Sequence, residues 1–391
     1  MSNFTSSEEE SDKQLYQTLL DDGALEIFER LICCDRLTLD AFESILFIIS
    51  NIAVTDQKCR DNIIISRCYK LILQKYPQFS SPKINHAMSW LLCNLCGGSS
   101  TSNLDFDTAR DILCRLKAIC QQTSLPEVVY HTLFSLFYFL KDRSQRQERL
   151  KYVFADEYLI NLVKEYLTTQ TEGIKQLVLE VLAFLSEHNG PQLLKICCPA
   201  VLNEVIKMLK VKDFQGSDKL TPICWRFLTQ MVASSNETAE CVVRNDREMF
   251  VIISDHFLPL VSDQEKIGAL VFLRTCFLAL DLDRLKNILR SNTDLIAGII
   301  GVLDEYEEGE ALNGELVMVI LETLLVMLRF GKSCELEEGE NIVKERIQNC
   351  PDNGILDRMA KGDIGGTQIQ KQLISDRTVE ILTEFFEWSG E

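Results

Sequence analysis

The stretch Asn85-His-Ala-Met-Ser-Trp90-Leu-Leu-Cys-Asn94-Leu-Cys-Gly-Gly98 decides how this chain is interpreted. Its apolar residues stand at helical spacing and two glycines follow, which predicts the last turns of an α-helix. Trp90 and Asn94 are four residues apart, so they share one face of that helix. A single tryptophan on an apolar helix is more often a core residue. An indole beside a carboxamide can instead hold an extended peptide, because the ring is a wall for a cationic stem and the amide can bond a backbone.

Similar helical segments recur along the chain, and one residue in each serves as a marker of its position. The markers are Asn51, Asn94, Tyr138, Phe184, Thr229, Thr275 and Val326. Their spacing of roughly 43 to 51 residues is the period of armadillo or HEAT units, and short linking helices between units favour armadillo. We expect an all-α, right-handed superhelical solenoid of about eight armadillo repeats over residues 14–388, because each unit has an apolar face that it cannot bury alone. Residues 1–13 read as an acidic, disordered N-terminal tail.

The charge of the chain limits the classes of partner. The 391 residues carry 58 acidic and 40 basic side chains, a formal net charge of −18. Nucleic-acid binders have a basic footprint, so we expect no nucleic-acid partner. An acidic surface suits a basic partner, although it also simply keeps many proteins soluble. No apolar run approaches the roughly 20 residues that cross a bilayer, so we expect no membrane span.

The sequence carries no catalytic or metal-binding signature. Its fifteen cysteines are scattered through apolar helical segments and are interpreted as reduced, buried thiols. Cys93 and Cys96 form a C-x-x-C without a second pair at zinc spacing, so no metal and no cofactor are expected. The four histidines have no neighbouring nucleophile signature, and no G-x-S-x-G, P-loop or H-E-x-x-H motif occurs. We therefore expect that the protein is not an enzyme.

Several segments resemble one known family, in that family's order and at its spacing. They are Phe47 to Ala53 followed by Cys59-Arg60-Asp61, Ala87 to Gly97, Leu133 to Leu140, Trp225 to Ala233, Val317 to Arg329 and Ile381 to Phe386. The chain resembles importin-α (karyopherin-α), an armadillo adaptor for nuclear import. The resemblance implies binding of basic nuclear localisation signals in a concave acidic groove, and a protein found in both cytoplasm and nucleus.

The resemblance also assigns site residues. In that family the third helix of each unit lines the groove, tryptophans form slots for Lys and Arg stems, and asparagines hold the cargo backbone. Carried over by position, the major-site-like residues are Phe47, Asn51, Asp56, Trp90, Asn94, Phe134 and Tyr138. A degraded, minor-site-like set is Glu180, Trp225 and Thr229.

The departures from the family pattern change the expected partners. The basic segment that binds importin-β has no counterpart, and the first two repeats have none either, so importin-β is not expected through the usual route. The C-terminal repeats match well and imply an export receptor as a further partner. We expect a monomer. The alternative function is an armadillo protein-interaction scaffold that has lost binding of nuclear localisation signals.

Overall fold

A computed structural model describes most of the chain. The described residues are 15–55, 57–97, 104–143, 145–169, 171–188, 191–210, 219–244, 246–258, 261–292, 294–305, 313–338, 341–350, 354–361 and 368–386. They fall into two compact units, the first ending at Val181 and the second beginning at Leu182. The predicted tail over residues 1–13 lies outside the described residues.

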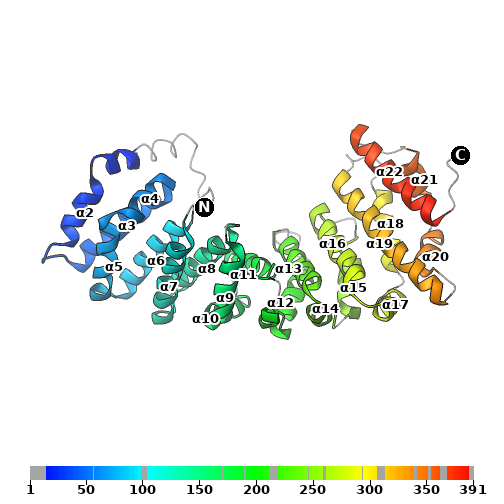
Figure 1. Cartoon of the computed structure of the whole chain (residues 1–391), viewed down its shortest axis with the longest axis horizontal. Coiled ribbons are helices and arrows are strands. Elements are labelled where there is room, and N and C mark those ends of the chain that lie inside the picture. Colours follow the sequence, from blue (N-terminus) through cyan, green and yellow to red (C-terminus); the bar gives the residue numbers. More distant parts are fainter. Residues whose placement is uncertain are drawn as a thin grey trace. The chain divides into compact units, whose positions relative to one another are not determined.

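All regular secondary structure in the described ranges is helical, with short turns between the helices (Figure 1). No strand occurs in these ranges, so the all-α prediction is confirmed. The helices of the first unit are α2 (Ala24–Ile32), α3 (Leu39–Thr55), α4 (Gln57–Ile65), α5 (Arg67–Phe79), α6 (Pro82–Cys96), α7 (Phe106–Gln122), α8 (Pro126–Lys141), α9 (Arg146–Ala155) and α10 (Glu157–Tyr166). Helix α11 (Glu172–Leu185) crosses the boundary between the units.

The second unit continues the same alternation of shorter and longer helices. It contains the 3-10 helix η1 (Pro191–Lys195), α12 (Pro199–Lys210), α13 (Leu220–Ser234), α14 (Asn236–Val242), α15 (Asp246–Asp255), α16 (Asp263–Ala279), α17 (Leu282–Ser291), α18 (Asp294–Glu305), α19 (Gly314–Glu338), α20 (Ile342–Gln348), α21 (Ile355–Ala360) and α22 (Gln368–Phe385).

One long helix closes each repeat. Within the described part of the chain these helices are α3, α6, α8, α11, α13, α16, α19 and α22, and they begin at residues 39, 82, 126, 172, 220, 263, 314 and 368. Successive starts are therefore 43 to 54 residues apart, close to the predicted 43 to 51. In the first unit α3 packs on α6 and α6 on α8; in the second, α13 packs on α16, α16 on α19 and α19 on α22. The long helices named in these pairs thus bury their apolar stripes against one another.

Helix α6 illustrates why the sequence folds in this way locally. Ser81 caps the helix by accepting a hydrogen bond from the Ile84 N–H at 3.3 Å. Pro82 follows at a position where its missing N–H leaves no bond unmade. Ile84, Leu91 and Leu95, which are spaced for one helical face, have no exposed surface. Burying each such side chain stabilises the fold by about 1.5–3 kcal/mol.

Polar side chains that follow a long helix reach back to its last carbonyls. Arg60, which is almost fully buried, donates to the Ala53 carbonyl of α3 at 3.2 Å. Arg149 donates to the Phe139 carbonyl of α8 at 3.3 Å and pairs with Asp142 at 2.9 Å. In the second unit Thr238 donates to the Met231 carbonyl at 2.6 Å. These bonds satisfy carbonyls that lack partners within their own helix, and they fix where the next repeat begins.

Asn341, which caps α20, also bonds a carbonyl inside α19, and its position depends on a glycine. Its Nδ2 donates to the Leu328 carbonyl at 3.5 Å, and its Oδ1 accepts from the Lys344 N–H at 3.1 Å. A Cβ at Gly331 would overlap this Oδ1 and lie 2.8 Å from the Asn341 Cγ. Asn341 is buried, so it has little room to move away.

We predict that Gly331→Ala destabilises the protein by about 1–3 kcal/mol, because the added methyl overpacks this junction. Gly301→Ala is the matched control, since Gly301 also lies inside a helix but a Cβ there meets nothing within 4 Å. The control should stabilise the helix by up to about 1 kcal/mol. Urea unfolding followed by circular dichroism measures both. Equal effects of the two substitutions would contradict the packing described for Asn341.

Candidate functional site

Half-buried rings from three successive long helices form what we call the aromatic face of the first unit. Its members are Phe47 of α3, His86 and Trp90 of α6, and Tyr130, Phe134, Phe137 and Tyr138 of α8. Four of the predicted major-site residues, Phe47, Trp90, Phe134 and Tyr138, belong to it. The partial burial means that each ring is held by the fold while part of its surface remains in contact with solvent.

The rings contact one another across the helices. Phe47 lies 5.2 Å from Trp90 and 6.1 Å from His86, between ring centroids. His86 stacks on the buried His131 of α8 at 5.6 Å, which joins α6 to α8. A chain of rings therefore runs from α3 through α6 to α8.

On α8 the rings follow helical spacing. Tyr130 stacks on Phe134 at 5.8 Å, and Phe134 meets the edge of Tyr138 at 4.8 Å. Gly97, which ends α6, lets these rings approach closely, because a Cβ there would lie 3.0 Å from Phe134 and 3.4 Å from Tyr138. Gly97, which helps to predict the end of α6, thus also makes room for the next repeat.

The two predicted asparagines differ in their surroundings. The Asn94 Nδ2 donates to the Ser50 carbonyl of α3 at 3.2 Å, so this amide links two repeats. Asn51, one turn beyond Phe47 on α3, is exposed. Asp56 lies outside the described residues.

His131 is held as a neutral ring beneath the aromatic face. The Ser89 hydroxyl donates to the His86 carbonyl at 2.8 Å and lies 2.8 Å from the His131 Nδ1. The hydroxyl has one proton to give, so the Nδ1–H of His131 donates to the Ser89 oxygen. Burial lowers the pKa of His131 from 6.5 to about 4, and the neighbouring His86 adds to this effect.

The charge of the three helices is nearly balanced. Helices α3, α6 and α8 carry three acidic residues, Asp40, Glu43 and Glu127, and two basic residues, Lys83 and Lys141. The acidic excess of the whole chain is therefore not concentrated on the helices that carry the aromatic face. Attraction of a basic partner at this face would come from the rings at short range and from the rest of the surface at longer range.

The minor-site-like residues do not lie in one unit. Glu180 is half-buried and belongs to the first unit, whereas Trp225 and the half-buried Thr229 belong to the second.

The prediction for Trp225 is corrected by its burial. Its side chain has no exposed surface and lies between His256 at 5.2 Å and Phe272 at 5.3 Å, measured between ring centroids. Gly268 of α16 permits this position, because a Cβ there would lie 2.9 Å from the indole. Trp225 is a core residue of the second unit, and it cannot form the wall of a groove while it is buried in this way.

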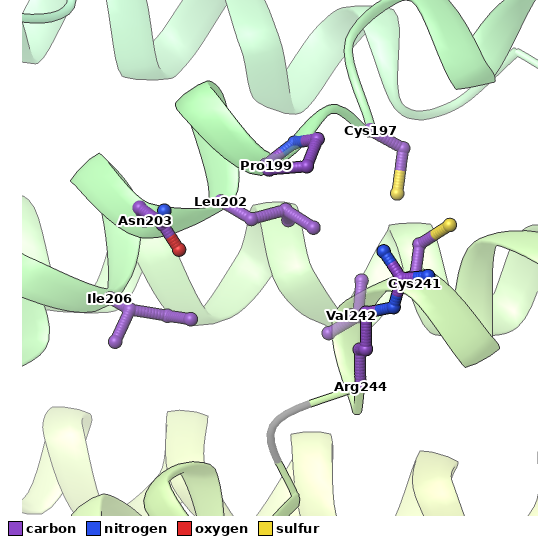
Figure 2. A pocket seen from close by; sticks show the side chains of 8 residues that line it. All are labelled: Cys197, Pro199, Leu202, Asn203, Ile206, Cys241, Val242 and Arg244. Atoms are coloured by element: carbon purple, nitrogen blue, oxygen red, sulfur yellow. The ribbon is translucent and has the colours of Figure 1, made fainter.

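A small cavity lies elsewhere in the second unit, between α12 and α14 (Figure 2). Its volume is about 140 Å³, and it is lined by Cys197, Pro199, Leu202, Asn203, Ile206, Cys241, Val242 and Arg244. Burial raises the pKa of the Cys197 thiol to about 12, so this thiol is protonated near neutral pH and is a poor nucleophile. None of the predicted site residues lines this cavity.

The two cysteines of the C-x-x-C motif are part of the packed core. Cys93 and Cys96 are both buried, and burial raises the pKa of the Cys96 thiol to about 12. Within the described ranges, no group of three or more His, Cys, Asp or Glu side chains is arranged to hold a metal ion. Among the same residues, no helix has the length and apolar character needed to cross a bilayer.

Comparison with known proteins identifies the type of repeat. No protein-family model and no curated protein matches the chain. An engineered protein of known structure matches with a TM-score of 0.60 at 13% identity, over 98% of this chain and 97% of its own. A designed armadillo repeat protein in complex with the peptide (KR)4 matches with a TM-score of 0.51 at 12% identity, over 68% of this chain and 98% of its own. The fold is an armadillo solenoid.

A third match agrees with this assignment. Computationally designed armadillo repeat proteins for modular peptide recognition match with a TM-score of 0.51 at 12% identity, over 68% of this chain and 97% of theirs. The predicted fold class is therefore confirmed. At these identities the matches establish the fold and do not single out the import-adaptor family.

Several members of the aromatic face lie outside the predicted set of site residues. His86, Tyr130 and Phe137 were not among the predicted site residues. Helical spacing carried a signal for two of them, since His86 is four residues before Trp90 and Tyr130 is four before Phe134.

We predict that His131 makes stability depend on pH. Its folded pKa lies below the unfolded value, so the unfolded chain takes up the proton first. The stabilisation is complete above pH 6.5 and is lost as the pH falls towards 4, by about 3 kcal/mol in total. His131→Asn cannot titrate but can still donate to Ser89. The stability difference between wild type and this variant should therefore shrink over that range, as measured by urea unfolding. A difference that stays constant with pH would contradict a buried neutral His131.

Proposed function

We propose that this protein is an armadillo scaffold that binds an extended, basic peptide segment along its aromatic face. The observation that carries the proposal is the row of half-buried rings on α3, α6 and α8, with Trp90 at its centre. Rings held in this way attract Lys and Arg side chains by cation–π interaction and offer apolar area to their stems. Because the fold already holds the rings, a bound peptide would order few side chains of the protein.

The individual residues have distinct roles in this proposal. Phe47 and Trp90 form the first slot for a basic side chain. The exposed Asn51 can bond the peptide backbone with both ends of its amide. Asn94 uses an N–H for the Ser50 carbonyl, so its oxygen is the atom that would accept a peptide N–H. The designed armadillo protein bound to (KR)4 supports the pairing of this fold with alternating Lys and Arg.

The more specific form of the proposal is an import adaptor. In this form the basic segments are nuclear localisation signals, the partners include an export receptor at the C-terminal repeats, and the protein is present in both cytoplasm and nucleus. Its support is the resemblance at Asn51, Trp90 and Asn94. An adaptor must accumulate a signal-bearing reporter in the nuclei of permeabilised cells. A chain that binds the signal peptide but leaves the reporter outside is a scaffold of another kind.

The second candidate function is a scaffold for partners without basic clusters. The observation that favours it is the near balance of charge on α3, α6 and α8. It differs from the first in its charge dependence, since a neutral or acidic peptide would then bind at least as well as a basic one.

We predict that isothermal titration with (KR)4 gives saturable binding that Trp90→Ala weakens by about two- to thirtyfold, the range of a single cation–π contact. Trp90 is a cleaner choice than Asn94, because removal of the Asn94 amide also breaks its bond to Ser50. A matched control is Tyr158→Ala, which removes a half-buried ring of α10 outside the aromatic face.

The control variant should bind (KR)4 as wild type does. A second control replaces the peptide with a glutamate-rich one of equal length, which should give no binding. Absence of heat with (KR)4, or equal affinity of wild type and Trp90→Ala, would rule out the proposed site.

A further inference from the structure

A lysine of the chain itself already lies on the aromatic face. Lys141 is the last residue of α8, and its Nζ lies 5.5 Å from the ring centroids of both Phe137 and Tyr138. These rings are four and three residues before it, so the side chain folds back along one turn of its own helix. Both distances are within the roughly 6 Å over which a cation is attracted to a ring.

The two rings form a fixed slot around this ammonium group. Phe137 and Tyr138 meet edge to face, with centroids 5.2 Å apart and planes at 85°. Phe134 contacts both rings, with its centroid 4.8 Å from that of Tyr138 and 6.4 Å from that of Phe137. Both slot rings are half-buried, so their orientation is set by packing and does not depend on the lysine.

We propose that this slot is an ammonium-binding subsite of the aromatic face, that Lys141 occupies it in the free protein, and that a lysine of the bound segment displaces Lys141. The inference rests on the proposed function, because it assigns a second subsite to the same peptide face. It also identifies lysine, which has a compact ammonium group, as the side chain that this subsite takes.

Lys141 is suited to displacement. Its side chain is exposed, so water can solvate the ammonium group as soon as it leaves the rings. The C-terminal end of α8 attracts any cation placed there, whether it belongs to the chain or to a ligand. A peptide lysine would therefore gain the contacts that Lys141 gives up, and the cost of exchange is small.

Arg149 provides the contrast within the same unit. Its guanidinium lies 4.8 Å from the Phe139 ring centroid, but it is 2% exposed and is bonded to Asp142 and to two backbone carbonyls. Removing it would take an ion-pair contact from the half-buried Asp142 and a hydrogen bond from each of the two carbonyls. The Arg149 contact is thus a fixed part of the fold, whereas the Lys141 contact can exchange with a ligand.

The consequence is a weak internal competition for basic peptides. In this proposal a peptide reaches the rings of Phe47 and Trp90 directly, whereas the slot at Phe137 and Tyr138 opens only when Lys141 moves. A segment with a single basic residue would use the first slot. A segment with several basic residues would use both, which favours clustered over isolated lysines.

The test is titration of (KR)4 into the full chain carrying Lys141→Met, which keeps an apolar stem and removes the ammonium group. Affinity should rise by about two- to fivefold relative to wild type, the value of one exposed cation–π contact. Lys83→Met is the matched control, because it removes one positive charge from α6 at an exposed position. Its gain should be smaller, since only the general charge changes.

A third variant ties the gain to the rings. Phe137→Leu in the Lys141→Met background keeps apolar bulk but removes one ring face, so it should abolish the gain. Equal gains for Lys141→Met and Lys83→Met, no gain for Lys141→Met, or a gain that survives Phe137→Leu would each overturn the subsite. If wild type binds (KR)4 and Trp90→Ala weakens binding while any of these results is found, only the subsite fails. If wild type does not bind (KR)4, the proposed function itself fails.

Discussion

The stacking of one long helix on the next is the constraint on which the rest of this structure depends. A single repeat cannot bury the apolar stripe of its long helix, so the stripe must face its neighbours. In the first unit α6 packs against both α3 and α8. Its His86 and Trp90 rings are half-buried and keep part of their surface in contact with solvent. The packing of the neighbouring repeat then decides how much of a tryptophan side chain on a long helix remains exposed to solvent. Trp90 and Trp225 show the two outcomes, since one is half-buried and the other has no exposed surface.

Polar bonds between repeats hold the stack in register. Buried Arg60 and Arg149 bond carbonyls near the ends of α3 and α8, and Asn94 bonds the Ser50 carbonyl across two long helices. The arginine bonds satisfy carbonyls that the helix ends leave unpaired, and the Asn94 bond adds a second donor to a carbonyl inside α3. The rings of the aromatic face are consequently ordered before any ligand arrives. This pre-organisation links the packing of the solenoid to its proposed use as a peptide-binding surface.

The fold could be predicted from the sequence because its signals are local and repeated. The spacing of the marker residues predicted the length of the repeat, and Gly97 predicted where α6 ends. Phe47, Trp90, Phe134 and Tyr138 were predicted as site residues, and each is a half-buried ring on a long helix. The burial of Trp225 could not be predicted in the same way, because it depends on Gly268 in the next repeat, 43 residues further along the chain. The bond from Asn94 to Ser50 also depends on contact between repeats, which periodicity alone does not specify.

The central claim is that an open indole in the first unit meets a basic peptide while the indole at Trp225 stays in the core. The most direct measurement is the indole N–H nuclear magnetic resonance signal of each of the three tryptophans during titration with (KR)4, with the Trp90 signal assigned by Trp90→Phe. The account predicts a saturable shift of the Trp90 signal and an unchanged Trp225 signal. A Trp90 signal that stays in place at saturating peptide, or a shift at Trp225 alone, would contradict it.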